Sequence, residues 1–216
     1  MEIGLFPLEL VLMPTERVPL HIFEPRYKEL IGECLRSGLE FGLVLEDEQG
    51  RREIGTRAVV VEVLQVFDDG RMNVVVEGHE RFRLRELTTG REFLTGEVEP
   101  VDDDEDDVPA PERDRALALF RRLVEAVGED VDEPDGSSGS LAFEIAARVD
   151  FGTEPKQELL ELRSEPVRLG QLCELLEGLA RLSPGRCSQG LSWRASRGQR
   201  PKAGRGVSPY PRPGWG

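Results

Sequence analysis

The segment Pro19-Leu20-His21-Ile22-Phe23-Glu24-Pro25-Arg26-Tyr27 decides how the first hundred residues of this chain fold. Proline fixes its own backbone angle φ, so Pro19 and Pro25 set the chain direction on either side of a short strand, residues 20–23. Pro25 also suits the first position of a helix, where Glu24 can cap the positive end. Arg26 can form a fork to a carboxylate. The segment predicts a strand-to-helix corner, and this structural role is favoured over direct contact with a ligand.

A helix is expected between Pro25 and Gly38. Its apolar residues recur at intervals of three and four, which places them on one face of a helix. They are Tyr27, Leu30, Ile31, Cys34 and Leu35. Gly38 suits the C-terminal stop. This helix should pack on a β layer, with Cys34 as a core thiol.

The rest of residues 1–100 is typical of β structure. The β-branched runs 58–67 and 72–77 flank Asp68-Asp69-Gly70, which indicates a hairpin. Residues 81–85 alternate between apolar and arginine side chains, as in a half-buried strand with its arginines facing away from the core. Gly78 marks a bulge or a strand-end turn before it. Further strand candidates are 39–45 and 92–98.

The second half of the chain changes character at an acidic run, residues 102–107. Runs of like charge stay solvated, so a linker over 102–111 is favoured over a metal site. Residues 112–181 then carry four short apolar stripes. Gly128 ends the first helix, Ser140 can cap the second, and Pro155 and Pro166 can open the third and fourth. Helices this short need to pack together.

The charge is distributed unevenly along the chain. Eight of the 28 basic residues and none of the 42 acids lie in 181–216, so residues 1–180 carry a formal charge of −22. Such a body would repel nucleic-acid phosphates, and only the tail could attract them. Residues 182–216 are rich in Pro and Gly and are expected to be disordered. They are either a frameshift product, a recent extension, or a basic arm for nucleic acid or for the acidic body.

Sites of catalysis are not evident. None of the three lysines follows the glycine of a P-loop, and none is a convincing base for a Ser–Lys protease. The three cysteines are scattered, which argues against disulfides and zinc. His79 is interpreted as a turn or edge residue. The chain is therefore expected to be no enzyme and to need no cofactor. It shows no signal peptide and no membrane span, so a cytoplasmic location is expected.

Several separated motifs resemble the N-terminal substrate-binding domain of Lon proteases. They are Leu5-Phe6-Pro7-Leu8, the segment 18–27, Ile54-Gly55-Thr56, residues 69–74 and residues 78–82. The resemblance implies an α+β fold: a PUA-like β-barrel over 1–101 with one packed helix, followed by a C-terminal helical bundle. This chain departs from the family pattern at Thr15-Glu16-Arg17, where the family usually has a small Gly-containing turn.

The resemblance also implies a function, namely recognition of polypeptide substrates without the ATPase and protease parts. Partners would be unfolded or flexible polypeptide segments, with a role as adaptor or regulator beside a protease or chaperone. Leu12, Met13 and Val18, in the loop 12–18, are candidate peptide-binding residues, because Met13 is flexible and apolar; a peptide could also add along the adjacent strand edge. A core position for all three is at least as well supported. The alternative function is a PUA-like reader of RNA or a nucleobase.

Overall fold

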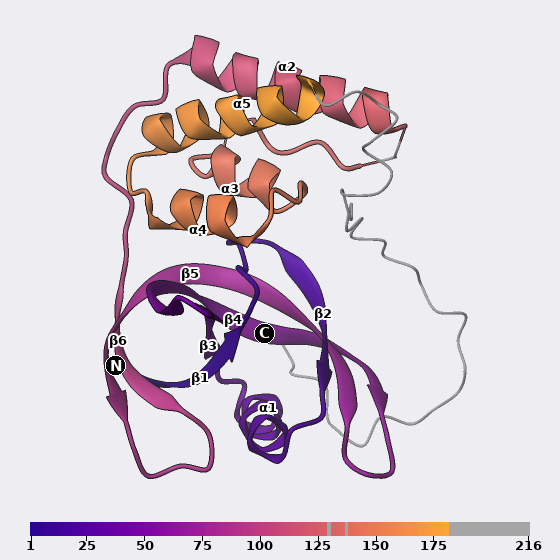
Figure 1. Ribbon diagram of the computed structural model, residues 1–216, viewed down its shortest axis with the longest axis vertical. Helices are drawn as coiled ribbons and strands as arrows, with labels where there is room; N and C mark the ends of the chain where they lie inside the picture. Colours follow the sequence, from indigo (N-terminus) through magenta and orange to yellow (C-terminus); the bar gives the residue numbers. More distant parts are fainter. Residues whose placement is uncertain (129–130, 137, 182–216) are drawn as a thin grey trace, which may run out of the picture.

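The computed structural model describes residues 1–128, 131–136 and 138–181. Figure 1 shows a β lobe with one helix, α1, at its lower end and a layer of helices across its upper end. The strands are β1 (Glu2–Leu8), β2 (Arg17–Ile22), β3 (Phe41–Asp47), β4 (Gly50–Val66), β5 (Met72–Thr88) and β6 (Thr95–Pro100). The helices are α1 (Pro25–Ser37), α2 (Ala110–Val127), α3 (Leu141–Ala146), α4 (Thr153–Glu161) and α5 (Glu165–Arg181). The α+β class is therefore confirmed.

The six strands form one sheet in the order β2-β5-β4-β3-β1-β6, and β5 also pairs with β6. The long strand β5 makes this possible, because its first half pairs with β2 and its second half with β6. Five strands thus close into a ring, and β2 lies outside that ring on the first half of β5. Such closure is what a barrel requires; that the lobe is a PUA-like β-barrel stays a prediction.

The predicted corner at 19–27 is present. Pro25 begins α1, and Gly38 ends it with a left-handed φ of 65° and an N–H that donates to the Cys34 carbonyl. Glu24 occupies the N-cap position, but its side chain makes no capping hydrogen bond. Its carboxylate instead accepts from Arg26, two residues along the chain. The prediction that the Glu24 side chain caps the helix is wrong. The carboxylate that Arg26 contacts is that of Glu24, which belongs to the same motif.

The strands predicted at 72–77 and 81–85 are one continuous strand, β5. The pairing register with β4 shifts between Thr56 and Ala58, opposite residues 78–81, so Gly78 adjoins a bulge. This bulge bends the strand instead of ending it. The expectation that Arg81 faces away from the core is wrong, since its side chain is buried.

The helices α2 to α5 share one apolar core, which includes Phe120, Leu141 and Leu172. Two residues of the loop before β2, Val11 and Met13, belong to the same core. The two lobes are therefore joined by a continuous apolar interface. Gly128 ends the first helix as expected, whereas Ser140 sits at the N-cap of α3 without a side-chain capping bond.

The acidic run lies between β6 and α2. The predicted tail, 182–216, lies outside the described residues, and so do the interpretations attached to it. None of the helices in the described ranges is long and apolar enough to cross a membrane.

Candidate functional site

The loop 12–18 is built into the core. Leu12, Met13 and Val18 are each at most 1% exposed, so their side chains offer no surface to a ligand. Leu12 and Val18 pack in the core beneath α1, whereas Met13 packs among the helices of the second lobe. The idea that these three side chains make adaptable surface contacts is thus wrong for the folded state. The structure agrees with the other interpretation, that these three are core residues. Peptide binding by neighbouring parts of the loop stays a prediction.

Backbone contacts fix this loop against β5. The Thr15 N–H donates to the Gly78 carbonyl at 2.7 Å, and the Gly78 N–H donates to the Glu16 carbonyl at 2.9 Å. A Cβ on Gly78 would lie 2.2 Å from the Met13 carbonyl oxygen, so only glycine admits this close approach. Thr15 has a φ of 68°, a left-handed conformation that is strained for a β-branched residue.

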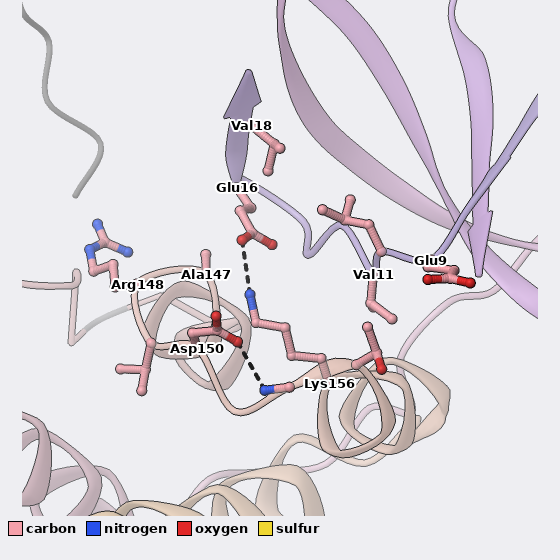
Figure 2. Close-up of a pocket in the computed structure, with 12 residues that line it drawn as sticks. Glu9, Val11, Glu16, Val18, Ala147, Arg148, Asp150 and Lys156 are labelled. Carbon is pink, nitrogen blue, oxygen red and sulfur yellow. Dashed lines mark hydrogen bonds and ion pairs between the residues drawn. The ribbon is translucent and has the colours of Figure 1, made fainter. Parts of the chain in front are cut away.

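A cavity of about 250 Å³ opens beside this loop, between the two lobes (Figure 2). Lys156 of α4 donates a hydrogen bond of 2.9 Å to Glu16, and both side chains are about nine-tenths buried. The second carboxylate oxygen of Glu16 accepts from the Met13 N–H. Figure 2 shows Lys156 reaching across the cavity toward the loop. The sequence placed Lys156 at a helix start, and nothing in it pointed to a partner 140 residues away.

Burial raises the pKa of Glu16, and the charge of Lys156 opposes that rise. The ion pair keeps the carboxylate compensated where burial leaves it little contact with water. Because the two charges satisfy each other, this cavity is better suited to holding the lobes together than to acid–base chemistry.

A second set of buried charges joins the acidic run to the helices. Asp103 accepts hydrogen bonds from Arg81 of β5 and, at 2.5 Å, from Arg168 of α5. Arg168 is fully buried, also pairs with Glu165, and stacks on the ring of Phe143 at 3.7 Å. Burial lowers the pKa of Arg81 and raises that of Glu165. The interpretation of the acidic run as a solvated linker is therefore wrong for Asp103, which is a structural counter-ion.

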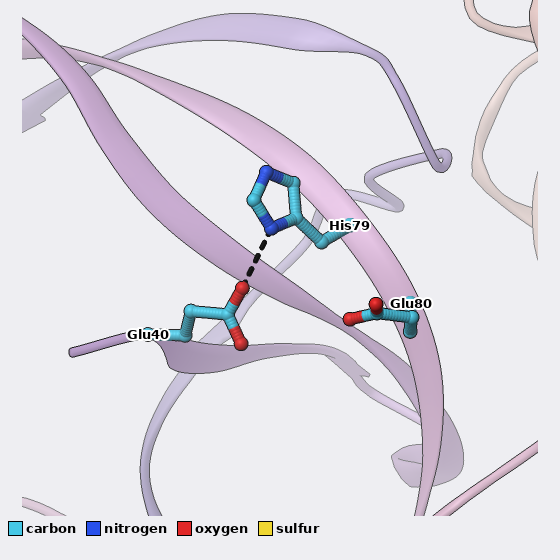
Figure 3. Close-up of side chains that lie close together, drawn as sticks. All are labelled: Glu40, His79 and Glu80. Carbon is cyan, nitrogen blue, oxygen red and sulfur yellow. Dashed lines mark hydrogen bonds and ion pairs between the residues drawn. The ribbon is translucent and has the colours of Figure 1, made fainter. Parts of the chain in front are cut away.

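A third cluster lies on the surface of the sheet (Figure 3). Glu40, His79 and Glu80 bring one possible metal-ligand atom each within 4.8 Å of one another. The His79 Nδ1 lies 2.6 Å from a Glu40 oxygen, within hydrogen-bond distance. Arg57, however, forms ion pairs with both carboxylates. A guanidinium already neutralises these acids, and a cation would have to displace it. His79 lies within the strand β5, next to the exposed residue Glu80, and not in a turn.

The described thiols are inert. Cys34 and Cys173 are both buried, and burial raises the pKa of Cys34 to about 11. A thiol with so little thiolate near neutral pH is a poor nucleophile and a poor metal ligand. The prediction of Cys34 as a core thiol is confirmed.

Several exposed apolar side chains belong to the β4–β5 hairpin and to the corner between β2 and α1. Phe23, just before α1, is 57% exposed. On the β4–β5 hairpin, Leu64, Val66 and Val61 are 50%, 51% and 42% exposed. The His21 ring lies 5.8 Å from the Phe23 ring and 6.1 Å from Phe67 at the hairpin tip. We call Phe23, Val61, Leu64 and Val66 the distal apolar surface. Figure 1 shows the tip of the β4–β5 hairpin projecting at the lower right, beyond α1. Clustered exposed apolar groups mark interaction surfaces more often than isolated ones do.

Comparison with known proteins gives one consistent family. The family model described as the ATP-dependent protease La (LON) substrate-binding domain matches residues 2–178. The chain is similar to the Lon protease of Anaeromyxobacter dehalogenans, with 30% identity over 187 residues that cover 77% of this chain and 22% of the relative. It is also similar to the Lon protease of Parabacteroides distasonis, with 27% identity over 77% of this chain and 23% of the relative. The chain thus spans less than a quarter of the length of these curated relatives.

Solved structures agree with this result. A Lon N-terminal domain protein from Xanthomonas campestris superposes with a TM-score of 0.63 at 26% identity, covering 81% of this chain and 98% of that one. The N-terminal domain of the Mycobacterium avium complex Lon protease superposes with a TM-score of 0.61 at 15% identity, covering 82% and 98%. The second likeness bears on the fold alone.

Proposed function

This chain belongs to the family of Lon substrate-binding domains, and from that premise we propose that it recognises unfolded or flexible polypeptide segments without acting on their bonds. The observation that carries the proposal is the distal apolar surface. Burying Leu64, Val66 and Phe23 on a partner would remove apolar area from water, which favours binding at roughly 25 cal/mol per Å² before the costs of association. Folded proteins hide such groups, whereas unfolded segments offer them.

The chemistry of the other clusters supports a binding role. Glu16 of the interlobe cavity is compensated by Lys156, and Asp103 of the acidic run is compensated by Arg81 and Arg168. The two described thiols, Cys34 and Cys173, are buried and have a raised pKa, whereas a nucleophilic thiol needs exposure and a lowered one. The protein would therefore act as a rigid two-lobe body that presents a binding surface. The bound polypeptide would change its conformation to fit that surface.

The finer role that we propose is that of an adaptor or regulator of proteolysis. A chain that shares only the substrate-binding part of its relatives could deliver clients to a protease or chaperone, or compete with such an enzyme for them. The alternative, recognition of RNA, is disfavoured by the charge of −22 on residues 1–180.

Fluorescence anisotropy with a labelled, carboxymethylated and hence unfolded protein tests the proposal. We expect saturable binding by the full chain, and we expect the double variant Leu64→Asp/Val66→Asp to weaken it at least tenfold. Leu87→Asp is the matched control, because Leu87 is 47% exposed but lies near the other end of β5. Equal binding by the two variants would refute the role of the distal apolar surface.

A further inference from the structure

The strand β2 has one ladder partner among the strands that the structure describes. It pairs with β5 in antiparallel register from Arg17 opposite Glu77 to Ile22 opposite Met72. It stands at the end of the strand order, and its other edge adjoins none of the described strands. Figure 1 shows β2 along the margin of the sheet. An open edge of this kind is a template for a further strand.

The hydrogen bonds at the start of β2 fix which of its backbone groups face outward. The Glu16 carbonyl accepts from Gly78 of β5 and so points toward β5, whereas the Glu16 N–H donates to the Met13 carbonyl within the loop. In an antiparallel ladder this direction alternates from one residue to the next. The groups of Val18, Leu20 and Ile22 therefore also point to β5, and those of Arg17, Pro19 and His21 point to the open edge.

Pro19 occupies the middle of the outward-facing set. Because proline has no N–H, its place on the open side costs the ladder with β5 nothing. The edge thus offers three carbonyl acceptors, at residues 17, 19 and 21, and two N–H donors, at Arg17 and His21. In the described part of the chain, no turn or loop carbonyl accepts from either donor. Proline on an edge also limits promiscuous strand pairing.

We propose that an extended segment of an unfolded polypeptide adds to this open edge and pairs with residues 17–21 of β2. This inference rests on the proposed function and supplies its binding mode. Backbone pairing explains how one surface accepts many sequences, since every client residue except proline brings the same donor and acceptor. The edge ends at Ile22, one residue before Phe23, so a segment that extends past it reaches Phe23 of the distal apolar surface.

Residue-resolved hydrogen exchange of the full chain, with and without the carboxymethylated client, tests the pairing. The amides of Val18, Leu20 and Ile22 are bonded to β5 and are expected to be protected in both states. The amides of Arg17 and His21 are expected to exchange fast in the free protein and to slow at least tenfold when client is bound. If the client binds and these two amides stay fast, the edge is not the site.

A pair of variants at one position provides a second test. His21→Ala removes the side chain and keeps the N–H, whereas His21→Pro also removes the N–H. The residue before it, Leu20, is already extended, as a residue preceding proline must be. We expect His21→Pro to bind the client about 2- to 10-fold more weakly than His21→Ala, the loss that one hydrogen bond implies. Equal affinities, with the amides of Val18 and Leu20 protected in both variants, would overturn the proposal.

The outcomes separate the two claims. Client binding that leaves Arg17 and His21 unprotected, and that is equal in the two His21 variants, would sink the edge and leave the proposed function standing. No binding of the client by the unmodified full chain would overturn both.

Discussion

Lys156 and Glu16, 140 residues apart, form a buried ion pair of 2.9 Å that ties the helical lobe to the loop before β2. Replacing Lys156 by Met would leave the Glu16 carboxylate buried without its counter-charge. Such a loss costs about 3–5 kcal/mol, so we expect the free energy of unfolding to fall by that amount in urea titrations at pH 7.

This cost should depend on pH. The pKa of Glu16 is raised above 4.5 by burial, so its contribution favours folding at low pH and is lost as the pH rises from 4.5 through the folded value. Removing Lys156 raises that pKa further. The destabilisation by Lys156→Met should therefore be larger at pH 7 than at pH 5, and adding Glu16→Gln should restore part of the stability. If the destabilisation by Lys156→Met did not change with pH, the pairing of Lys156 with a buried, charged Glu16 would be contradicted.

Asp103 differs from its neighbours in the acidic run because it pairs with Arg81 and Arg168. Asp103→Asn keeps the shape and removes the charge, leaving two buried guanidinium groups less well compensated. We expect a loss of about 2 kcal/mol or more in thermal or urea unfolding. Asp106→Asn, an exposed member of the same run, should change stability by less than about 0.5 kcal/mol. Similar effects of both variants would refute a structural role for Asp103.

Gly78 is required by the loop that crosses it. In Gly78→Ala the new Cβ would meet the Met13 carbonyl at 2.2 Å, so the loop or β5 must shift. Backbone displacement of this kind costs about 1–3 kcal/mol. Gly170→Ala adds the same methyl group at an exposed position of α5, where nothing lies within 4 Å, and should stabilise by up to about 1 kcal/mol. Calorimetry on the two variants should give shifts of opposite sign.

Thr15 holds a left-handed backbone conformation that glycine adopts without strain. Thr15→Gly should raise the free energy of unfolding by up to about 1 kcal/mol, because it relieves the αL cost of a β-branched side chain. Thr15→Ala retains a Cβ and should give less. A destabilised glycine variant would show that the hydroxyl or methyl of Thr15 contributes to the fold.

Local patterns predicted the local structure well. Pro25, Gly38 and Gly128 mark helix ends because their backbone preferences act at their own positions. The apolar spacing of residues 27–35 likewise predicted the buried face of α1. These signals need no knowledge of distant residues.

Long-range pairings were not predictable. Lys156 could have paired with any of 42 acids, and Asp103 is one of six consecutive acids, so no pattern singled out either residue. Leu12, Met13 and Val18 are apolar, which suits a binding surface as well as a core. Only the fold of the second lobe over the loop decides between them. The distal apolar surface was missed for the same reason, because its β-branched run looks like any buried strand.

The most direct test of the central claim is calorimetric titration of the full chain with one client protein in two states, folded and carboxymethylated. We expect saturable binding of the unfolded state alone, with a negative heat-capacity change from the burial of apolar surface. Absence of binding to the unfolded client, or equal binding to the folded one, would contradict the claim that this chain recognises unfolded polypeptide.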